Sequence, residues 1–187
     1  TGMGLERLVC LIQDGETNFD TDLFLPIIHA TEQYAKHSYS EKEYKMAYRV
    51  IADHIRTVTF AIADGAMFSN EGRGYVLRRV LRRAVRYGIK LGIDGAFMYK
   101  LVKVVADNMI AYYPYVQEKV ALIEKLVKQE EESFHKTLAN GEALLQDALA
   151  NMRILRFYLA KSCSSYMILM DIQRNLLQRL QRKKAIV

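Results

Sequence analysis

The chain has 187 residues, 51% of them hydrophobic and 26% charged, an ordinary balance for one domain with a buried core. The longest apolar run, around residues 60–63, is far shorter than the ~20 residues of a membrane-spanning helix. The formal net charge is +6, but residues 153–187 hold eight basic side chains and one acidic one. Residues 1–152 therefore carry a net −1, and only local clusters of charge within them can indicate a polyanionic partner.

Helical patterns dominate the chain, because there are only two prolines and apolar residues recur at spacings of three and four. We therefore predict an all-α fold. Asp22 is the expected N-cap of the second helix, with Pro26 in its first turn. The acidic run at residues 130–132 is expected to be a solvated helix face. The other expected helices cover residues 4–13, 41–63, 75–91, 97–112 and 116–152.

Cysteine and histidine spacing indicates neither a disulfide framework nor a metal site. Cys10 and Cys163 lie far apart, and the histidines at 29, 37, 54 and 135 are scattered. The start of the chain lacks a signal-peptide pattern, so we expect a cytoplasmic protein with no membrane partner. Because the chain begins at Thr1 rather than at Met, we expect a fragment of a longer protein.

The segment from Tyr75 to Leu91 alternates pairs of basic and apolar residues, which gives a helix one packing face and one cationic face. No Asp or Glu lies between Gly72 and Ile93, and the stripe from 78 to 90 extends roughly 18 Å at ~1.5 Å per residue. This length suits several phosphates along one nucleic-acid strand. The alternative is that some of these arginines pair with acids of other helices, such as Glu130 to Glu132.

Ser69, Asn70 and Glu71 lie in the turn before this arginine helix. The Asn70 amide can both donate to and accept from a base edge, and A-form RNA exposes base edges in a shallow minor groove. A turn Asn before a helix can also be an ordinary cap, and this interpretation stays open.

Four motifs occur in an order and near a spacing that resemble alanyl-tRNA synthetases. They are TGMGLERLV at 1–9, NFDTDLFLPII at 18–28, YRVIADHIRTVTFAIADG at 48–65 and SNEGRGYVLRRVLRRAVRYG at 69–88. The resemblance covers about residues 1–150. It implies an irregular helical bundle that recognises tRNA, with the N-terminal helix at the edge of a class II catalytic domain. Phe68 departs from the proline usual in the family.

The resemblance also implies a function. The parent would be an alanine-tRNA ligase that activates alanine with ATP and Mg²⁺ and transfers it to tRNA(Ala), identified by a G·U wobble pair in the acceptor stem; DNA is not an expected partner. Gly2, Gly4 and Arg7 would contact ATP, with Arg7 as the catalytic residue, and Asn70 would help to read the wobble pair. The fragment alone is not expected to catalyse aminoacylation or to hold a metal. The arginines implied in acceptor-stem binding are Arg73, Arg78, Arg79, Arg82, Arg83 and Arg86.

The resemblance stops after about residue 151, where the family would continue with a segment whose Asp is the second reader of the wobble pair. Tyr166 to Gln173 can be encoded by a string that, read two bases later, gives the family-like Tyr-Asp-Thr-Tyr-Gly-Tyr-Pro. We therefore expect the basic tail, residues 152–187, to be a frameshift product; a divergent basic helix is the alternative.

The expected organisation is the catalytic-domain edge at 1–20, the helical tRNA-recognition domain at 21–151 and the non-homologous tail at 152–187. A competing interpretation of the whole chain is a helical protein-interaction module, in which the arginines form salt bridges within the fold and the apolar helix faces dock a protein partner.

Overall fold

The computed structural model describes the backbone of residues 2–161 and the side chains of residues 2–149. Its described part is helical and contains no strand, which confirms the all-α prediction. The chain divides into two compact units, residues 1–135 and 136–187. The predicted tail, 152–187, lies outside the residues whose side chains are described. The elements are α1 (Leu5–Ile12), the 3₁₀ turn η1 (Asn18–Asp20), α2 (Leu25–Glu32), α3 (Lys42–Ala63), α4 (Gly72–Lys90), α5 (Met98–Met109), α6 (Pro114–Glu118) and α7 (Val120–Lys161).

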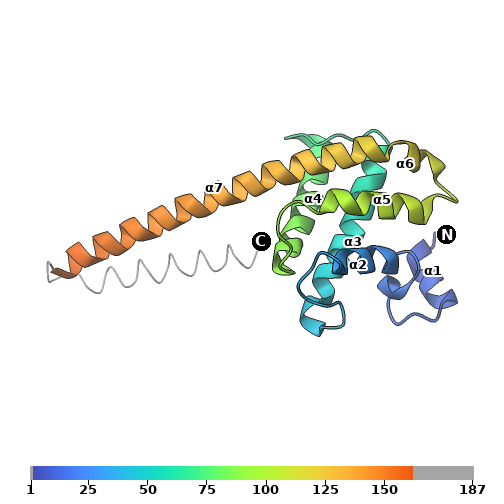
Figure 1. Ribbon diagram of the computed structural model, residues 1–187, viewed down its shortest axis with the longest axis horizontal. Helices are drawn as coiled ribbons and strands as arrows, with labels where there is room; N and C mark the ends of the chain where they lie inside the picture. Colours follow the sequence, from blue (N-terminus) through green and yellow to red (C-terminus); the bar gives the residue numbers. More distant parts are fainter. Residues whose placement is uncertain (1, 162–187) are drawn as a thin grey trace. The chain divides into compact units, whose positions relative to one another are not determined.

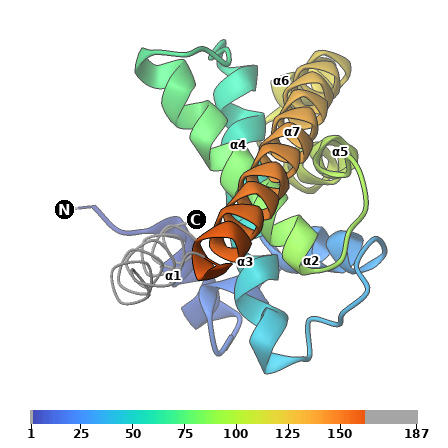
Figure 2. The same cartoon turned by 90° about the vertical axis from the view of Figure 1, so that its left-hand side faces the viewer.

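Helix α3 is the central element of the first unit. It packs against α2, α4, α5 and α6, and Figures 1 and 2 show it in cyan, running through the middle of that unit. Its apolar face is fully buried at Ile51, Ile55 and Val58, and it meets Leu81 of α4 and Leu101 of α5 in the same core. Burying side chains of this size stabilises the fold by about 1.5–3 kcal/mol each. None of the described helices is both long and apolar enough to span a membrane.

Several predicted boundaries are wrong. Asp22 does not cap α2, because the helix begins later and its N-cap residue is Phe24. The Asp22 backbone N–H donates to Gln13 Oε1 at 3.1 Å. Helix α4 begins at Gly72 rather than at Tyr75. The long helix predicted from residue 116 is interrupted at Lys119, which ends α6 and whose Nζ donates to the Ala63 carbonyl at 2.6 Å.

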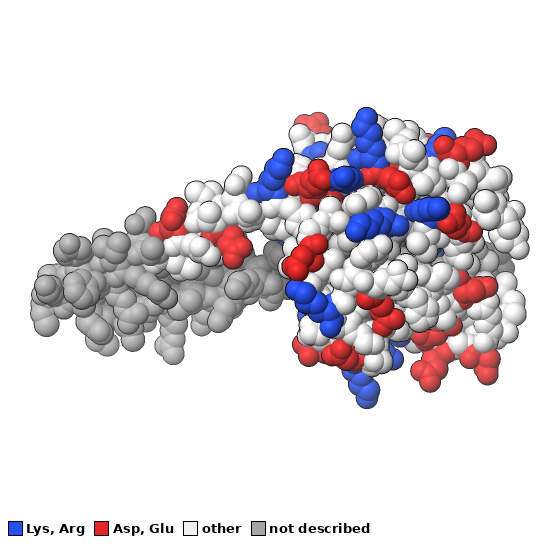
Figure 3. Space-filling model, in the orientation of Figure 1, with Lys and Arg blue, Asp and Glu red and all other residues white. Residues whose placement is uncertain are grey.

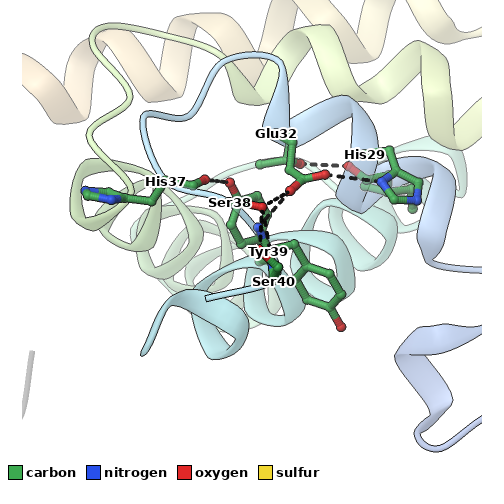
Figure 4. A network of polar contacts seen from close by, with 9 residues as sticks. His29, Glu32, His37, Ser38, Tyr39 and Ser40 are labelled. Atoms are coloured by element: carbon green, nitrogen blue, oxygen red, sulfur yellow. Dashed lines mark hydrogen bonds and ion pairs between the residues drawn. The ribbon is translucent and has the colours of Figure 1, made fainter. Parts of the chain in front are cut away.

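The loop between α2 and α3 is fixed by polar contacts around Glu32, which Figure 4 shows. The Glu32 carboxylate accepts from the Tyr39 N–H at 2.7 Å and from the Ser38 hydroxyl at 3.0 Å. These contacts hold the pKa of Glu32 below its usual value, the Tyr39 N–H being the largest cause. The Tyr48 hydroxyl donates to the His37 carbonyl, and burial raises the pKa of Tyr48 to about 12. The network joins the loop to the body of the fold.

The prediction that the acidic run at residues 130–132 is a solvated helix face is wrong for two of its residues, because only Glu132 is solvated. Glu130 is 8% exposed and Glu131 is fully buried. The Glu131 carboxylate accepts from the N–H groups of Phe97 and Met98, at 3.0 and 3.1 Å, and so satisfies backbone donors at the start of α5. Two of these three acids are therefore packing residues that join α7 to other helices.

Candidate nucleic-acid interface

The loop that carries Asn70 is held closely against the first turn of α4. A Cβ atom on Gly74 would lie 2.2 Å from the Met67 carbonyl oxygen and 2.8 Å from the Ser69 backbone nitrogen. Only glycine permits this approach. The Ser69 hydroxyl donates to the Glu71 carbonyl at 2.6 Å and tightens the turn further. Asn70 therefore lies in a loop whose backbone is constrained by its contacts with α4.

Asn70 is exposed, and it is not the cap of α4. The N-cap residue is Glu71, whose side chain makes no capping hydrogen bond. The Asn70 Oδ1 atom instead accepts from Arg78 Nη1. The cap interpretation is thus wrong, and one of the two hydrogen-bonding ends of this amide is engaged by the arginine helix.

The arginines of α4 fall into two groups, the first of which packs against α7. We call Arg78, Arg82 and Arg86 the anchored arginines, because all three are partly buried. Glu130 Oε1 lies 3.1 Å from Arg78 Nε and 2.8 Å from Arg82 Nη2. The Arg82 Nε–H also donates to this oxygen at 2.9 Å. The alternative of internal pairing is therefore confirmed for Arg78 and Arg82.

Phe134 extends this packing along the same side of α4. The guanidinium carbons of Arg82 and Arg86 lie 5.1 and 5.7 Å from its ring centroid, within the range of a cation–π contact. Phe134 was not among the functional residues predicted from the sequence. The spacing of four between the anchored arginines was the available signal, since residues four apart share one side of a helix.

The second group consists of Arg73, Arg79 and Arg83, which we call the exposed arginines. The guanidinium of Arg79 lies 5.8 Å from the ring centroid of the exposed Tyr75. The pKa of Asp53 on α3 is lowered, mainly by a side-chain hydrogen bond with His54, and the positive charge of Arg83 contributes. Their exposure leaves these three cations accessible to an anionic partner.

The face of the molecule seen in Figure 3 does not form one basic field. On the face seen in Figure 3, blue basic and red acidic side chains are interspersed. This mixture agrees with the small net charge of residues 1–152. A polyanion would therefore be attracted by the local cations of α4 rather than by the net charge of the body.

The predicted ATP-contacting residues lie on a different element. Gly4 is the N-cap of α1, and Arg7 is exposed on that helix. Glu6, beside Arg7, joins α1 to α3 through an ion pair with Arg56 at 2.5 Å. An exposed guanidinium suits phosphate oxygens, to which it donates in a planar fork. No group of three or more His, Cys, Asp or Glu side chains able to hold a metal ion occurs among the described residues.

Comparison with known proteins shows a clear relationship. The family model described as tRNA synthetases class II (A) matches residues 1–162. The alanine–tRNA ligases of Halalkalibacterium halodurans and Bacillus velezensis are each 61% identical to this chain over 150 residues, covering 80% of the chain. That of Bacillus anthracis is 58% identical over 155 residues, or 82% of the chain. The chain spans only 17–18% of the length of these relatives.

Proposed function

The chain belongs to the family of class II (A) tRNA synthetases, and from this premise we propose that it is the helical tRNA-recognition segment of an alanine–tRNA ligase. The predicted resemblance to alanyl-tRNA synthetases is confirmed by the 58–61% identity with alanine–tRNA ligases. We also propose a cytoplasmic location for the whole enzyme.

We propose that the whole enzyme attaches alanine to tRNA(Ala) at the expense of ATP. Within this segment, Gly2, Gly4 and Arg7 would contribute to the ATP site. Arg7 fits that role because its guanidinium is exposed at the start of α1 and can donate to phosphate oxygens. Mg²⁺ would accompany ATP, and the alanine site would be formed by other parts of the enzyme.

The exposed arginines beside the Asn70 loop carry the RNA-binding proposal. Arg73, Arg79 and Arg83 would contact phosphates of the tRNA(Ala) acceptor stem, while Asn70 would meet a base edge in the shallow minor groove. Arg78, Arg82 and Arg86 would support this face from the α7 side, and the edges of their guanidinium groups would add to the positive potential. DNA is not an expected partner.

The competing protein-interaction module shares one feature with the structure, because Arg78 and Arg82 do form salt bridges within the fold. This feature concerns only the anchored arginines. The family relationship favours RNA as the partner of the exposed ones.

Salt dependence distinguishes the two partners. The chain would be titrated with an alanine acceptor-stem RNA hairpin at several salt concentrations. Phosphate contacts predict that log affinity falls linearly with log salt, with a slope of roughly 0.7–0.9 per phosphate neutralised. Three contacts by the exposed arginines would therefore give a slope of at least about 2. An affinity that hardly changes with salt, or no binding at low salt, would contradict the proposal.

A further inference from the structure

Glu130 stands at the start of a continuous line of polar contacts that ends at Asn70. It is 8% exposed on α7, and its Oε1 atom meets both Arg78 and Arg82. Arg78 uses its Nε for this ion pair and its Nη1 for the hydrogen bond to Asn70 Oδ1. One guanidinium thus joins a nearly buried carboxylate to an exposed amide.

The chemistry of the middle residue determines how the amide is oriented. A guanidinium only donates hydrogen bonds, so the end of the Asn70 amide that faces Arg78 must be its oxygen. The NH₂ group of Asn70 then faces away from Arg78 and can donate to a partner. Without this contact the amide could turn over, since an exposed terminal torsion of Asn is broad.

The position of Arg78 depends in turn on Glu130. The Arg78 side chain is 21% exposed, so water could solvate it in more than one rotamer. The nearly buried negative charge of Glu130 attracts Arg78 as well as Arg82 to one oxygen atom, and this attraction favours the rotamer of Arg78 that keeps its 3.1 Å ion pair. The planar fork of a guanidinium then transmits that orientation to its other nitrogen.

We propose that Glu130 is a positioning residue for RNA recognition, which acts through Arg78 to fix the orientation of the Asn70 amide. The statement about RNA rests on the proposed function; the contact line itself does not. Glu130 would therefore affect which acceptor stem the chain prefers more than how tightly it binds RNA in general.

The line can be tested in the free chain by NMR. The side-chain NH₂ signals of Asn70, assigned by their loss in Asn70→Ala, should move in Glu130→Met, which keeps the length of the side chain and removes both acceptor oxygens. They should move back part of the way in Glu130→Gln, which keeps one acceptor. Glu132→Met is the matched control, because Glu132 is 51% exposed and pairs with Lys128 instead. Unchanged Asn70 signals in Glu130→Met would overturn the proposal.

A second variant covers the case in which Glu130→Met does not fold, as judged by circular dichroism. Arg78→Lys keeps the positive charge but lacks the fork that reaches both Glu130 and Asn70. It should move the same Asn70 signals, and their constancy would also overturn the proposal.

Binding to two hairpins gives the functional readout. The ratio of affinities for the G·U hairpin and its G·C variant should fall roughly fivefold or more in Glu130→Met. If Glu130 only repelled phosphates, its removal would instead tighten binding to both hairpins equally, and this result would reject the positioning role. Failure of the unmodified chain to bind either hairpin would reject the proposed function, and the NMR comparison would still decide whether the contact line exists.

Discussion

Glu130 and Glu131 are neighbours on α7 that bind different helices. Glu130 pairs with side chains of α4, whereas Glu131 accepts hydrogen bonds from the backbone at the start of α5. Consecutive helical residues point about 100° apart, so one turn of α7 can contact both helices. Burial raises the pKa of Glu131 to about 7, although the N–H groups of Phe97 and Met98 act in the opposite direction.

This raised pKa predicts an unusual pH dependence of stability. The folded chain binds the Glu131 proton more tightly than the unfolded chain, in which the pKa is about 4.5. The free energy of unfolding should therefore increase as the pH falls from about 7.5 to 5, by up to about 2 kcal/mol from this group. Denaturant unfolding at both pH values measures the change.

Glu131→Gln is the control, because it keeps one acceptor oxygen and cannot titrate. All other ionisable groups are the same in both proteins, so their contribution cancels in the comparison. The variant should lose the part of the pH dependence that Glu131 causes. Identical pH dependence in the two proteins would show that Glu131 is already ionised in the folded chain at pH 5.

At the scale of the elements, the close contact between α4 and its preceding loop determines where Asn70 lies. Gly74→Ala would force the Met67 and Ser69 backbone away from the helix, because the new Cβ would lie 2.2 Å from a carbonyl oxygen. We expect a loss of about 1–3 kcal/mol in the free energy of unfolding, as for other overpacked sites. Affinity for the RNA hairpin should also fall, since the loop moves.

Gly141→Ala on α7 provides the matched substitution. Among the residues that the structure describes, none lies within 4 Å of the new Cβ. Alanine in a helix interior should stabilise by roughly 0.5–1 kcal/mol. Equal effects of the two substitutions on thermal unfolding and hairpin affinity would argue against the close contact at Gly74.

Most helices could be predicted from apolar periodicity. The helix interruption and the buried acidic residues that depend on tertiary packing could not. The interruption at Lys119 has no Gly or Pro to indicate it, and the lysine is instead bonded to a carbonyl of α3. The acidic run has the composition of a solvated face, and its burial depends on partners found 33 residues or more away in the sequence. Local patterns do not contain such pairings.

The candidate nucleic-acid interface could also be predicted only in part. Charge spacing identified the arginine helix and the loop amide beside it. It could not show which arginines face α7, because this depends on how two helices pack. The resemblance named all six arginines together, and the structure separates Arg78, Arg82 and Arg86 from the exposed ones.

At the scale of the whole molecule, the net charge of +6 does not indicate where a polyanion would bind. Residues 153–187 supply a net +7, and residues 1–152 together are slightly acidic. We assign RNA binding to local cations on α4 that adjoin the Asn70 loop. A test of that assignment must therefore separate the α4 cations from the basic tail.

The most direct measurement compares the unmodified chain with the double variant Arg79→Glu and Arg83→Glu, each titrated with the alanine acceptor-stem hairpin at several salt concentrations. Lys42→Glu with Lys103→Glu is the control, because it makes the same charge change at exposed residues of α3 and α5. The account predicts much weaker binding by the arginine variant alone, with a salt slope smaller by roughly 1.4–1.8. Equal affinities and slopes for all three proteins would contradict the account and assign RNA binding to another part of the chain.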